Sequence, residues 1–340
     1  MEAFFRTPSK MDIERMGERN IRIYDQIQHF GAKKYLLIGN GLNKSLGIDF
    51  DWDSIKKEIR KNCKNHLIKE ILDHKNTDLE RCLKIFDNLA EAKEFFSSKI
   101  DLNIDEIREA RDLLRQNICE ELHKKHASKD DYQKHIKRLA RRISQFDAVF
   151  TLNYDLLLYW TILKCNEKNP YSFNDGFGGS KELGRIWGEN SNSQNIFFLH
   201  GALHLYRHHE ITHKHAHSNR GILSHVKLHL IEKKYPMFIS EGLSHQKLTK
   251  IENNKYLKFG LNALRGFEKN RKLNSSSNER ISLVIFGTHL KANDDHIVDA
   301  IKSNKRISKI SCFSVNGEME VNKKLDISEY FPASSFFSFT

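Results

Sequence analysis

The chain has 340 residues, 39% of them hydrophobic, which is enough for one large domain or two modest ones with a real core. The 56 Lys and Arg residues against 44 Asp and Glu residues give a net charge of +12, which favours an acidic partner such as nucleic acid or a phosphorylated metabolite. The basic residues are spread along the chain, however, so a solvated basic surface explains them better. The five cysteines form no Cys-x-x-Cys pair, the N-terminus has no signal-peptide pattern, and no apolar run reaches the ~18 residues of a membrane span. These features argue against a disulfide scaffold, a four-cysteine zinc ribbon and a membrane protein, and we expect a cytoplasmic protein.

Six short apolar runs rich in Val, Ile, Leu and Phe predict strands. Their apolarity is continuous rather than alternating, which is typical of parallel strands covered on both faces. We therefore predict an α/β fold, a Rossmann-like, mostly parallel six-stranded sheet with helices on both faces. The six runs are residues 34–39, 147–152, 195–200, 236–240, 281–287 and 309–315.

A helical segment separates the first two predicted strands. Residues 53–146 carry Leu, Ile and Phe at steps of three and four, with neither proline nor glycine, which predicts an inserted α-helical subdomain. An α/β domain then comprises residues 34–52 and 147–340, preceded by an N-terminal helical segment at 1–33. The Gly-, Asn- and Ser-rich residues 169–195 predict a loop.

The first strand runs directly into Gly39-Asn40-Gly41. Glycine permits positive φ and lets backbone amides approach a pyrophosphate. The third glycine is Gly47, whereas the dinucleotide pattern G-x-G-x-x-G requires it where Lys44 stands. A tight strand-to-helix turn without a ligand is the alternative interpretation.

Four motifs in order strengthen the interpretation as a ligand site. Gly39 to Ile48 resembles the opening NAD-binding motif of sirtuins, Gly-Ala-Gly-Ile-Ser followed after three residues by Gly-Ile. Thr151 to Asp155 (TLNYD) resembles their Thr-Gln-Asn-x-Asp, and Leu199 to Gly201 (LHG) resembles their His-Gly. Phe286 to Leu290 (FGTHL) is similar to their Gly-Thr-Ser-Leu, and Ser314 to Glu318 (SVNGE) weakly resembles their Ile-Asn contact with ribose. The resemblance covers residues 34–318 and implies an NAD site at the carboxyl ends of the strands.

The resemblance also implies residue roles. Asn153 would hold a water or the ribose hydroxyls, Asp155 would orient the loop or bind the ligand, and His200 would be the general base. Asp175 to Gly179 would close over the nicotinamide end. The residues implied in NAD binding are Gly39, Asn40, Gly41, Asn43, Ser45, Gly287, Thr288 and Asn316.

Three departures separate the chain from deacylating sirtuins. The paired Cys-x-x-Cys motifs of their zinc module are absent, Asp49 to Trp52 replaces Pro-Asp-Phe-Arg, and Leu152 stands where deacylases have Gln. With these departures the chain resembles the zinc-free sirtuin-like NAD hydrolases of bacterial antiviral defence. The resemblance implies an NAD+ glycohydrolase that depletes NAD in abortive infection, under control of a separate sensor or activator subunit, a homo-oligomer, or both. It implies no cofactor beyond the substrate NAD, no zinc and no membrane.

Alternatives remain open at the level of the sequence. An NAD-dependent protein deacylase and a non-catalytic module that binds a nucleotide or nucleic acid are the competing functions. Asn153 would then cap a helix, and His200 would be a core histidine. Nine histidines lie within residues 200–229, where exposed or pH-sensitive histidines are favoured over a metal site. Two further segments allow two interpretations each. Asp294, Asp295 and His296 could form a metal site or the start of a helix. Ser244, Gln246 and Lys247 could form an anion site or belong to a surface helix.

Overall fold

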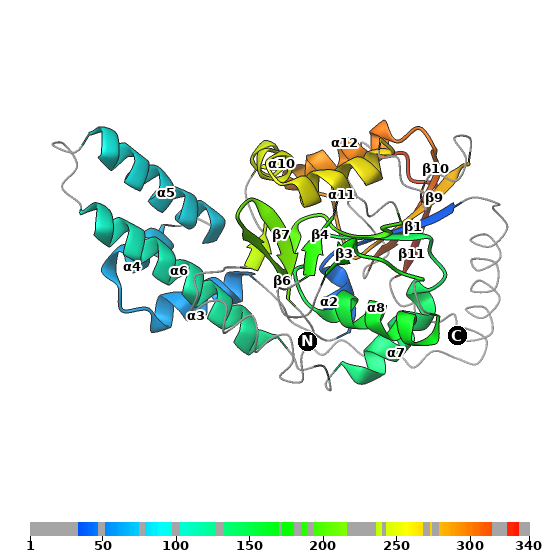
Figure 1. Cartoon of the computed structure of the whole chain (residues 1–340), viewed down its shortest axis with the longest axis horizontal. Helices are drawn as coiled ribbons and strands as arrows, with labels where there is room; N and C mark the ends of the chain where they lie inside the picture. The colour runs from blue at the N-terminus through cyan, green and yellow to red at the C-terminus, as the bar shows by residue number, and fades with distance from the viewer. Residues whose placement is uncertain are drawn as a thin grey trace, which may run out of the picture.

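The protein is described here as a computed structural model covering residues 33–46, 52–74, 79–96, 103–126, 129, 132–169, 172–179, 185–188, 193–215, 236–239, 243–267, 273, 279–314 and 325–332. Its centre is a parallel sheet of six strands in the order β11-β10-β9-β1-β2-β5 (Figure 1). The α/β fold predicted from the sequence is therefore confirmed. The strands are β1 (Lys33–Ile38), β2 (Ala148–Thr151), β5 (Ile196–Phe198), β9 (Ile281–Phe286), β10 (Ile307–Ser314) and β11 (Glu329–Pro332).

Continuous apolarity in the central strands matches their burial. All four residues of β2 and all three of β5 are buried, and β1 and β9 are buried at every position but the second. Helices α10 (Ser244–Glu252), α11 (Lys255–Arg265) and α12 (Asp295–Ser303) lie on one side of the sheet, and α7 (Gln133–Ile143) and α8 (Leu157–Lys168) lie on the other (Figure 1). Both faces of the sheet are covered, so β1, β2, β5 and β9 have no solvated side.

The prediction of which six runs form the sheet is wrong at one strand. Residues 236–240 contain β8 (Pro236–Phe238), which pairs with β6 in a second, antiparallel sheet, while the sixth parallel strand is β11. The second sheet has the order β3-β4-β7-β6-β8. It also occupies part of the segment 169–195 that was predicted as loop. Its other strands are β3 (Phe177–Gly178), β4 (Arg185–Trp187), β6 (Gly201–His208) and β7 (Ile211–Lys214).

The segment between β1 and β2 is helical, as its residue spacing predicts. Short helix α2 (Gly41–Ser45) follows β1, and then come α3 (Trp52–Asn62), α4 (His66–Asp73), α5 (Leu79–Phe95), α6 (Ile104–Lys125) and α7. Asn65 and Asn103 cap α4 and α6 with their side-chain oxygens. Helices α3 to α6 extend away from the sheet, whereas α7 packs against α8 beside it (Figure 1). The division into domains stays a prediction, and residues 1–32 of the predicted N-terminal segment lie outside the described residues.

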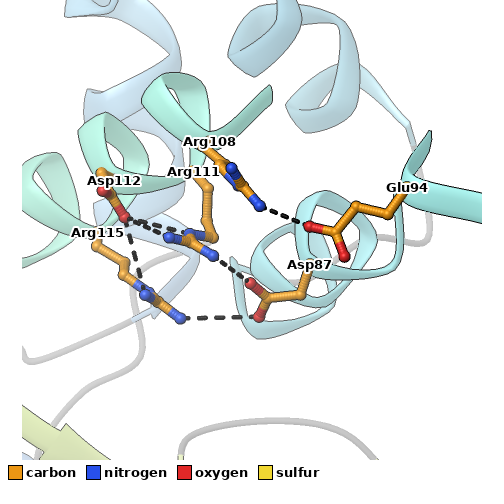
Figure 2. A network of polar contacts seen from close by, with 6 residues as sticks. All are labelled: Asp87, Glu94, Arg108, Arg111, Asp112 and Arg115. Carbon is orange, nitrogen blue, oxygen red and sulfur yellow. Dashed lines mark hydrogen bonds and ion pairs between the residues drawn. The ribbon is translucent and has the colours of Figure 1, made fainter. Parts of the chain in front are cut away.

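Helices α5 and α6 pair through an apolar seam and a rim of ion pairs. Leu79, Cys82 and Phe86 on α5 and Ile107, Ala110 and Leu114 on α6 are buried at helical spacing. At the rim, Arg111 contacts Asp87 at 3.0 Å and Arg108 contacts Glu94 at 2.6 Å (Figure 2). Figure 2 shows that Arg115 and Asp112 complete this network. Because these charges are at least partly exposed, we assign most of the pairing energy to the apolar seam.

In the part of the chain that the structure describes, no helix is long and apolar enough to cross a bilayer.

Candidate functional site

Four of the predicted motif loops meet at the carboxyl edge of the parallel sheet. Ile38 at the end of β1 pairs with Thr151 of β2 on one side and with Phe286 of β9 on the other, and Thr151 pairs with Phe198 of β5. The loops that follow these four neighbouring strands therefore leave the sheet side by side. In open α/β sheets this edge is where ligands bind.

The glycines of the first loop are required by its contact with the loop after β9. A Cβ added to Gly39 would lie 2.4 Å from Thr288 Cβ and 2.6 Å from the Gly287 carbonyl oxygen, and one added to Gly41 would lie 2.5 Å from Gly287 Cα. Gly287 itself has a φ of +70°, which favours glycine. The two loops are thus held in backbone contact.

The amides of these glycines are used within the protein. Gly39 N–H donates to Phe286 O at 2.8 Å, and Gly41 N–H donates to Gly287 O at 2.7 Å. The predicted contact of these two amides with a pyrophosphate is therefore replaced by bonds that join β1 to β9. What the glycines contribute to the site is its shape.

Asn153 connects the loop after β2 to the loop after β1. Its side-chain amide donates to the Gly39 carbonyl at 3.2 Å, and its backbone N–H donates to Thr151 Oγ1 at 3.0 Å. The alternative role of Asn153 as the cap of α8 does not occur. Instead Asp155 Oδ1 accepts from Leu157 N–H at 2.8 Å at the start of that helix.

Asn43 and Asp155 form a buried polar pair beside Asn153. Asn43 Nδ2 donates to Asp155 Oδ2 at 2.8 Å, and both side chains are at most 3% exposed. The carboxylate fixes the amide orientation because it accepts only from N–H, which turns Asn43 Oδ1 away from it. Among the described residues Asn43 Oδ1 has no hydrogen-bond partner although it is buried. Such an acceptor is a candidate to bind a hydroxyl or amide of a ligand.

His200 occupies the position in the β5 loop that matches Asn153 in the β2 loop. Each lies two residues beyond a member of the register pair Thr151 and Phe198. His200 Nε2 lies 3.0 Å from Nε2 of His296, at the start of α12. His200 is 2% exposed, which agrees with the alternative of a core histidine. Its hydrogen-bond partner, however, is a second imidazole.

The surroundings keep both imidazoles uncharged. Burial lowers the pKa of His200 well below its usual range, and the Lys247 ammonium lowers it further. Burial, and after it the neighbouring His200, lowers the pKa of His296 to about 3. Lys247 Nζ is itself buried and binds Asp294 Oδ1 at 2.8 Å. His200, His296 and Asp294 present ligand atoms within 4.8 Å of one another, and one carboxylate oxygen of Asp294, Oδ1, is bound by Lys247.

The remaining residues predicted to bind NAD differ in exposure and in their hydrogen-bond partners. Asn40 and Ser45 are exposed, and the Ser45 hydroxyl donates to Leu42 O at 2.7 Å within α2. Thr288 is half-buried, and its Oγ1 accepts from Leu290 N–H at 3.3 Å. Asp175 pairs with Lys214 next to the second sheet, where Phe177 and Gly178 form β3. Asn316 and Gly47 lie outside the described residues.

The histidine-rich segment is mostly a hairpin of the second sheet. His204, His213 and His215 are buried, whereas His208 and His209 are exposed. Of the two alternatives in the prediction, exposed or pH-sensitive histidines, exposure holds for His208 and His209 and is wrong for His204, His213 and His215. The His204 ring lies between Tyr159 and Phe198, with ring centroids 4.6 Å and 4.8 Å away. His217, His225 and His229 lie outside the described residues.

Sequence reasoning did not place three further residues beside His200. The sequence predicts a metal site or a helix start for His296 and an anion site or a surface helix for Ser244, and α12 and α10 do begin at Asp295 and Ser244. Lys247 was considered as a surface or anion-binding residue, yet it points inward to Asp294. Ser244 and Lys247 lie three residues apart on α10 and so share a face of that helix, whereas His296 lies on α12, and no local pattern joins the three.

These features define an α/β protein in which polar side chains gather on loops at the carboxyl edge of the parallel sheet. The chain belongs to the family described as "Domain of unknown function (DUF4917)", whose model matches residues 36–329. A search of curated proteins finds no match.

Two solved structures are similar at low identity. One is Sir2 in complex with the inhibitor EX-527, 2'-O-acetyl-ADP-ribose and deacetylated p53 peptide, at 12% identity and a TM-score of 0.38, over 94% of this chain and 95% of that chain. The other is Sir2Tm bound to a propionylated peptide, at 12% identity and a TM-score of 0.37, over 94% of each chain. At such TM-scores the likeness carries no weight for activity.

Proposed function

We propose that this protein is an NAD+ glycohydrolase, which converts NAD+ and water to ADP-ribose and nicotinamide. The observation that carries the proposal is the matched placement of Asn153 and His200, each two residues beyond the paired strand ends Thr151 and Phe198. An amide and a neutral imidazole thus stand on adjacent loops of the edge where open α/β sheets bind nucleotides. Gly39, Gly41 and Gly287 have no side chains, which lets the loops after β1 and β9 approach each other closely.

The chemistry needs orientation more than acid catalysis. The nicotinamide ring leaves as a neutral molecule because it starts as a pyridinium, and the developing ribosyl cation resembles that of other glycosidic cleavages. The protein must place a water and accept its proton. In this proposal Asn153 orients the water or the ribose hydroxyls, Asn43 Oδ1 accepts a ligand hydrogen, and His200 accepts the proton. Burial keeps His200 uncharged at neutral pH, and because the same lowered pKa makes it a weak base, the proton that it accepts has to be passed on.

The wider role that we propose is that of an effector of bacterial antiviral defence. Uncontrolled loss of NAD is lethal, so the enzyme needs control by an activator subunit, by self-assembly or by both. Support for this role comes from the sequence motifs and their departures from the deacylases. The proposal predicts that cells carrying the chain lose NAD during phage infection and that Asn153→Ala abolishes this loss.

The test is product analysis of purified full-length protein incubated with NAD+, with and without acyl-lysine peptide and with candidate activators. We expect ADP-ribose and nicotinamide without peptide, and a loss of about 10²-fold or more in Asn153→Ala and in His200→Ala. His245→Asn is the matched control because His245 is exposed on the outer side of α10. Product that requires peptide would establish a deacylase instead, and turnover unchanged in both site variants would refute the assignment.

A further inference from the structure

The contact between His200 and His296 restricts where protons can lie. The two Nε2 atoms are 3.0 Å apart and the rings are nearly parallel, at 29°. At this distance one Nε2 carries a hydrogen and the other accepts it. The tautomer of His200 is therefore coupled to the tautomer of His296.

Ser244 continues the chain of contacts toward the surface. Its Oγ accepts from the His296 backbone N–H at 2.7 Å and lies 3.1 Å from His296 Nδ1. Ser244 is the first residue of α10 and is half-buried, whereas His200 and His296 are at most 2% exposed. At the inner end, Nδ1 is the His200 ring nitrogen that is not used in the contact with His296. The chain of contacts thus runs from a buried imidazole at one end to a half-buried hydroxyl at the other.

We propose that His296 is a positioning residue for His200 and that His200, His296 and Ser244 form a proton relay from the crevice to the surface; this inference rests on the proposed NAD+ hydrolysis. In the resting state His296 Nδ1–H donates to Ser244 Oγ and His200 Nε2–H donates to His296 Nε2. This arrangement leaves the lone pair of His200 Nδ1 for the proton of the attacking water. His296 thereby holds His200 in the tautomer that can act as a base.

In the proposed step the proton released by the attacking water reaches solvent through three side chains. The carbon–nitrogen bond to nicotinamide breaks as the water oxygen bonds to the anomeric carbon, and the water proton passes to His200 Nδ1. The Nε2 proton of His200 moves to His296 Nε2, and the Nδ1 proton of His296 passes through Ser244 Oγ to solvent. Because neither imidazole is stable as a cation in this buried setting, transfer along the chain is favoured over storage on one ring.

The charged groups around the pair favour a proton over a metal ion between the two rings. Lys247 faces the pair and binds Asp294 at 2.8 Å, and Arg265 adds a second positive charge near His296. Two imidazoles on a tetrahedral zinc would have nitrogen atoms about 3.4 Å apart, since each zinc–nitrogen bond is about 2.0–2.1 Å. The observed 3.0 Å is a hydrogen-bond distance.

The kinetic test compares His296→Asn and Ser244→Ala with the exposed control His245→Asn in the full chain. We expect kcat to fall about 10- to 100-fold in His296→Asn with KM for NAD+ nearly unchanged, as for residues that orient a catalytic group. We expect Ser244→Ala to lower kcat and to change the solvent deuterium isotope effect on kcat. Imidazole added to His296→Gly should restore activity in a saturable manner. Changes confined to KM, or an unchanged isotope effect in Ser244→Ala, would overturn the relay.

A second measurement does not depend on activity. Long-range proton–nitrogen NMR spectra of the protein labelled with 15N-histidine report which ring nitrogen of each histidine is protonated, with assignment from His200→Gln and His296→Gln. The relay requires one protonated and one unprotonated Nε2 within this pair. Two unprotonated Nε2 atoms, or one equivalent of tightly held Zn²⁺ that is lost in His296→Asn, would overturn it. If the wild type shows the paired tautomers but hydrolyses no NAD+, the proposed function fails and the paired geometry stands.

Discussion

Replacing Gly287 with alanine tests the close contact between the loops that follow β1 and β9. The new Cβ would lie 2.6 Å from Leu42 N and 2.8 Å from Gly41 Cα, and these are backbone atoms that no rotamer change can move. Overpacking of this kind costs about 1–3 kcal/mol. The φ of +70° adds about 1–2 kcal/mol for a residue with a side chain. The sum of about 2–5 kcal/mol is a large part of the about 5–15 kcal/mol that stabilises an ordinary protein.

Urea unfolding followed by circular dichroism measures the effect, with the midpoint expected to fall and the slope to stay constant. Gly188→Ala is the matched control because a Cβ at Gly188 meets nothing within 4 Å. We expect the control to lie within about 0.5 kcal/mol of the wild type, as surface substitutions do. A Gly287→Ala variant as stable as Gly188→Ala would refute the close approach of the two loops.

Three further predictions concern buried polar groups and the helical segment. His204→Phe removes a buried ring whose nitrogens have no partner among the described residues, so stability at pH 7 should change by no more than about 1 kcal/mol. Burial lowers the pKa of His204, so the folded wild type loses stability as pH falls below about 6.5, the pKa of histidine in the unfolded chain. The variant should therefore be about 1–2 kcal/mol more stable than the wild type at pH 5. An equal loss of stability in both proteins would contradict this. Asn43→Asp places a second carboxylate against Asp155, so urea unfolding should show a loss of about 2–4 kcal/mol at pH 7 that partly recovers near pH 4 as one carboxyl takes a proton; a pH-independent loss would point to another cause. Arg111→Met should cost no more than about 1 kcal/mol while Leu114→Ala costs about 2–5 kcal/mol, and the reverse order would show that the ion pairs of Figure 2 dominate.

The central strands were predictable because their environment is uniform. Strands β1, β2 and β9 are covered on both faces, so their sequences are apolar almost without interruption. The second sheet was not predictable in the same way. Strand β6 contains His204, a polar residue that interrupts the apolar pattern by which a buried strand is predicted. In the structure its ring packs between two aromatic rings and is 0% exposed. Strand β11 ends in Pro332 and is only four residues long, which is a weak signal.

The site was predictable to the level of the strand ends and no further. The motifs locate Asn153 and His200 because each follows directly on a recognisable strand. The partners of these residues come from distant parts of the chain. His296 is 96 residues from His200, and Gly39 is 114 residues from Asn153. Only the strand order β9-β1-β2-β5 and the packing of α10 and α12 bring these groups together.

A crystal structure with a carbocyclic NAD analogue that cannot be hydrolysed tests the central claim most directly. We predict that the analogue lies across the loops after β9, β1, β2 and β5, with its anomeric position between Asn153 and His200. An analogue bound elsewhere, or one whose anomeric position lies away from both side chains, would contradict the account.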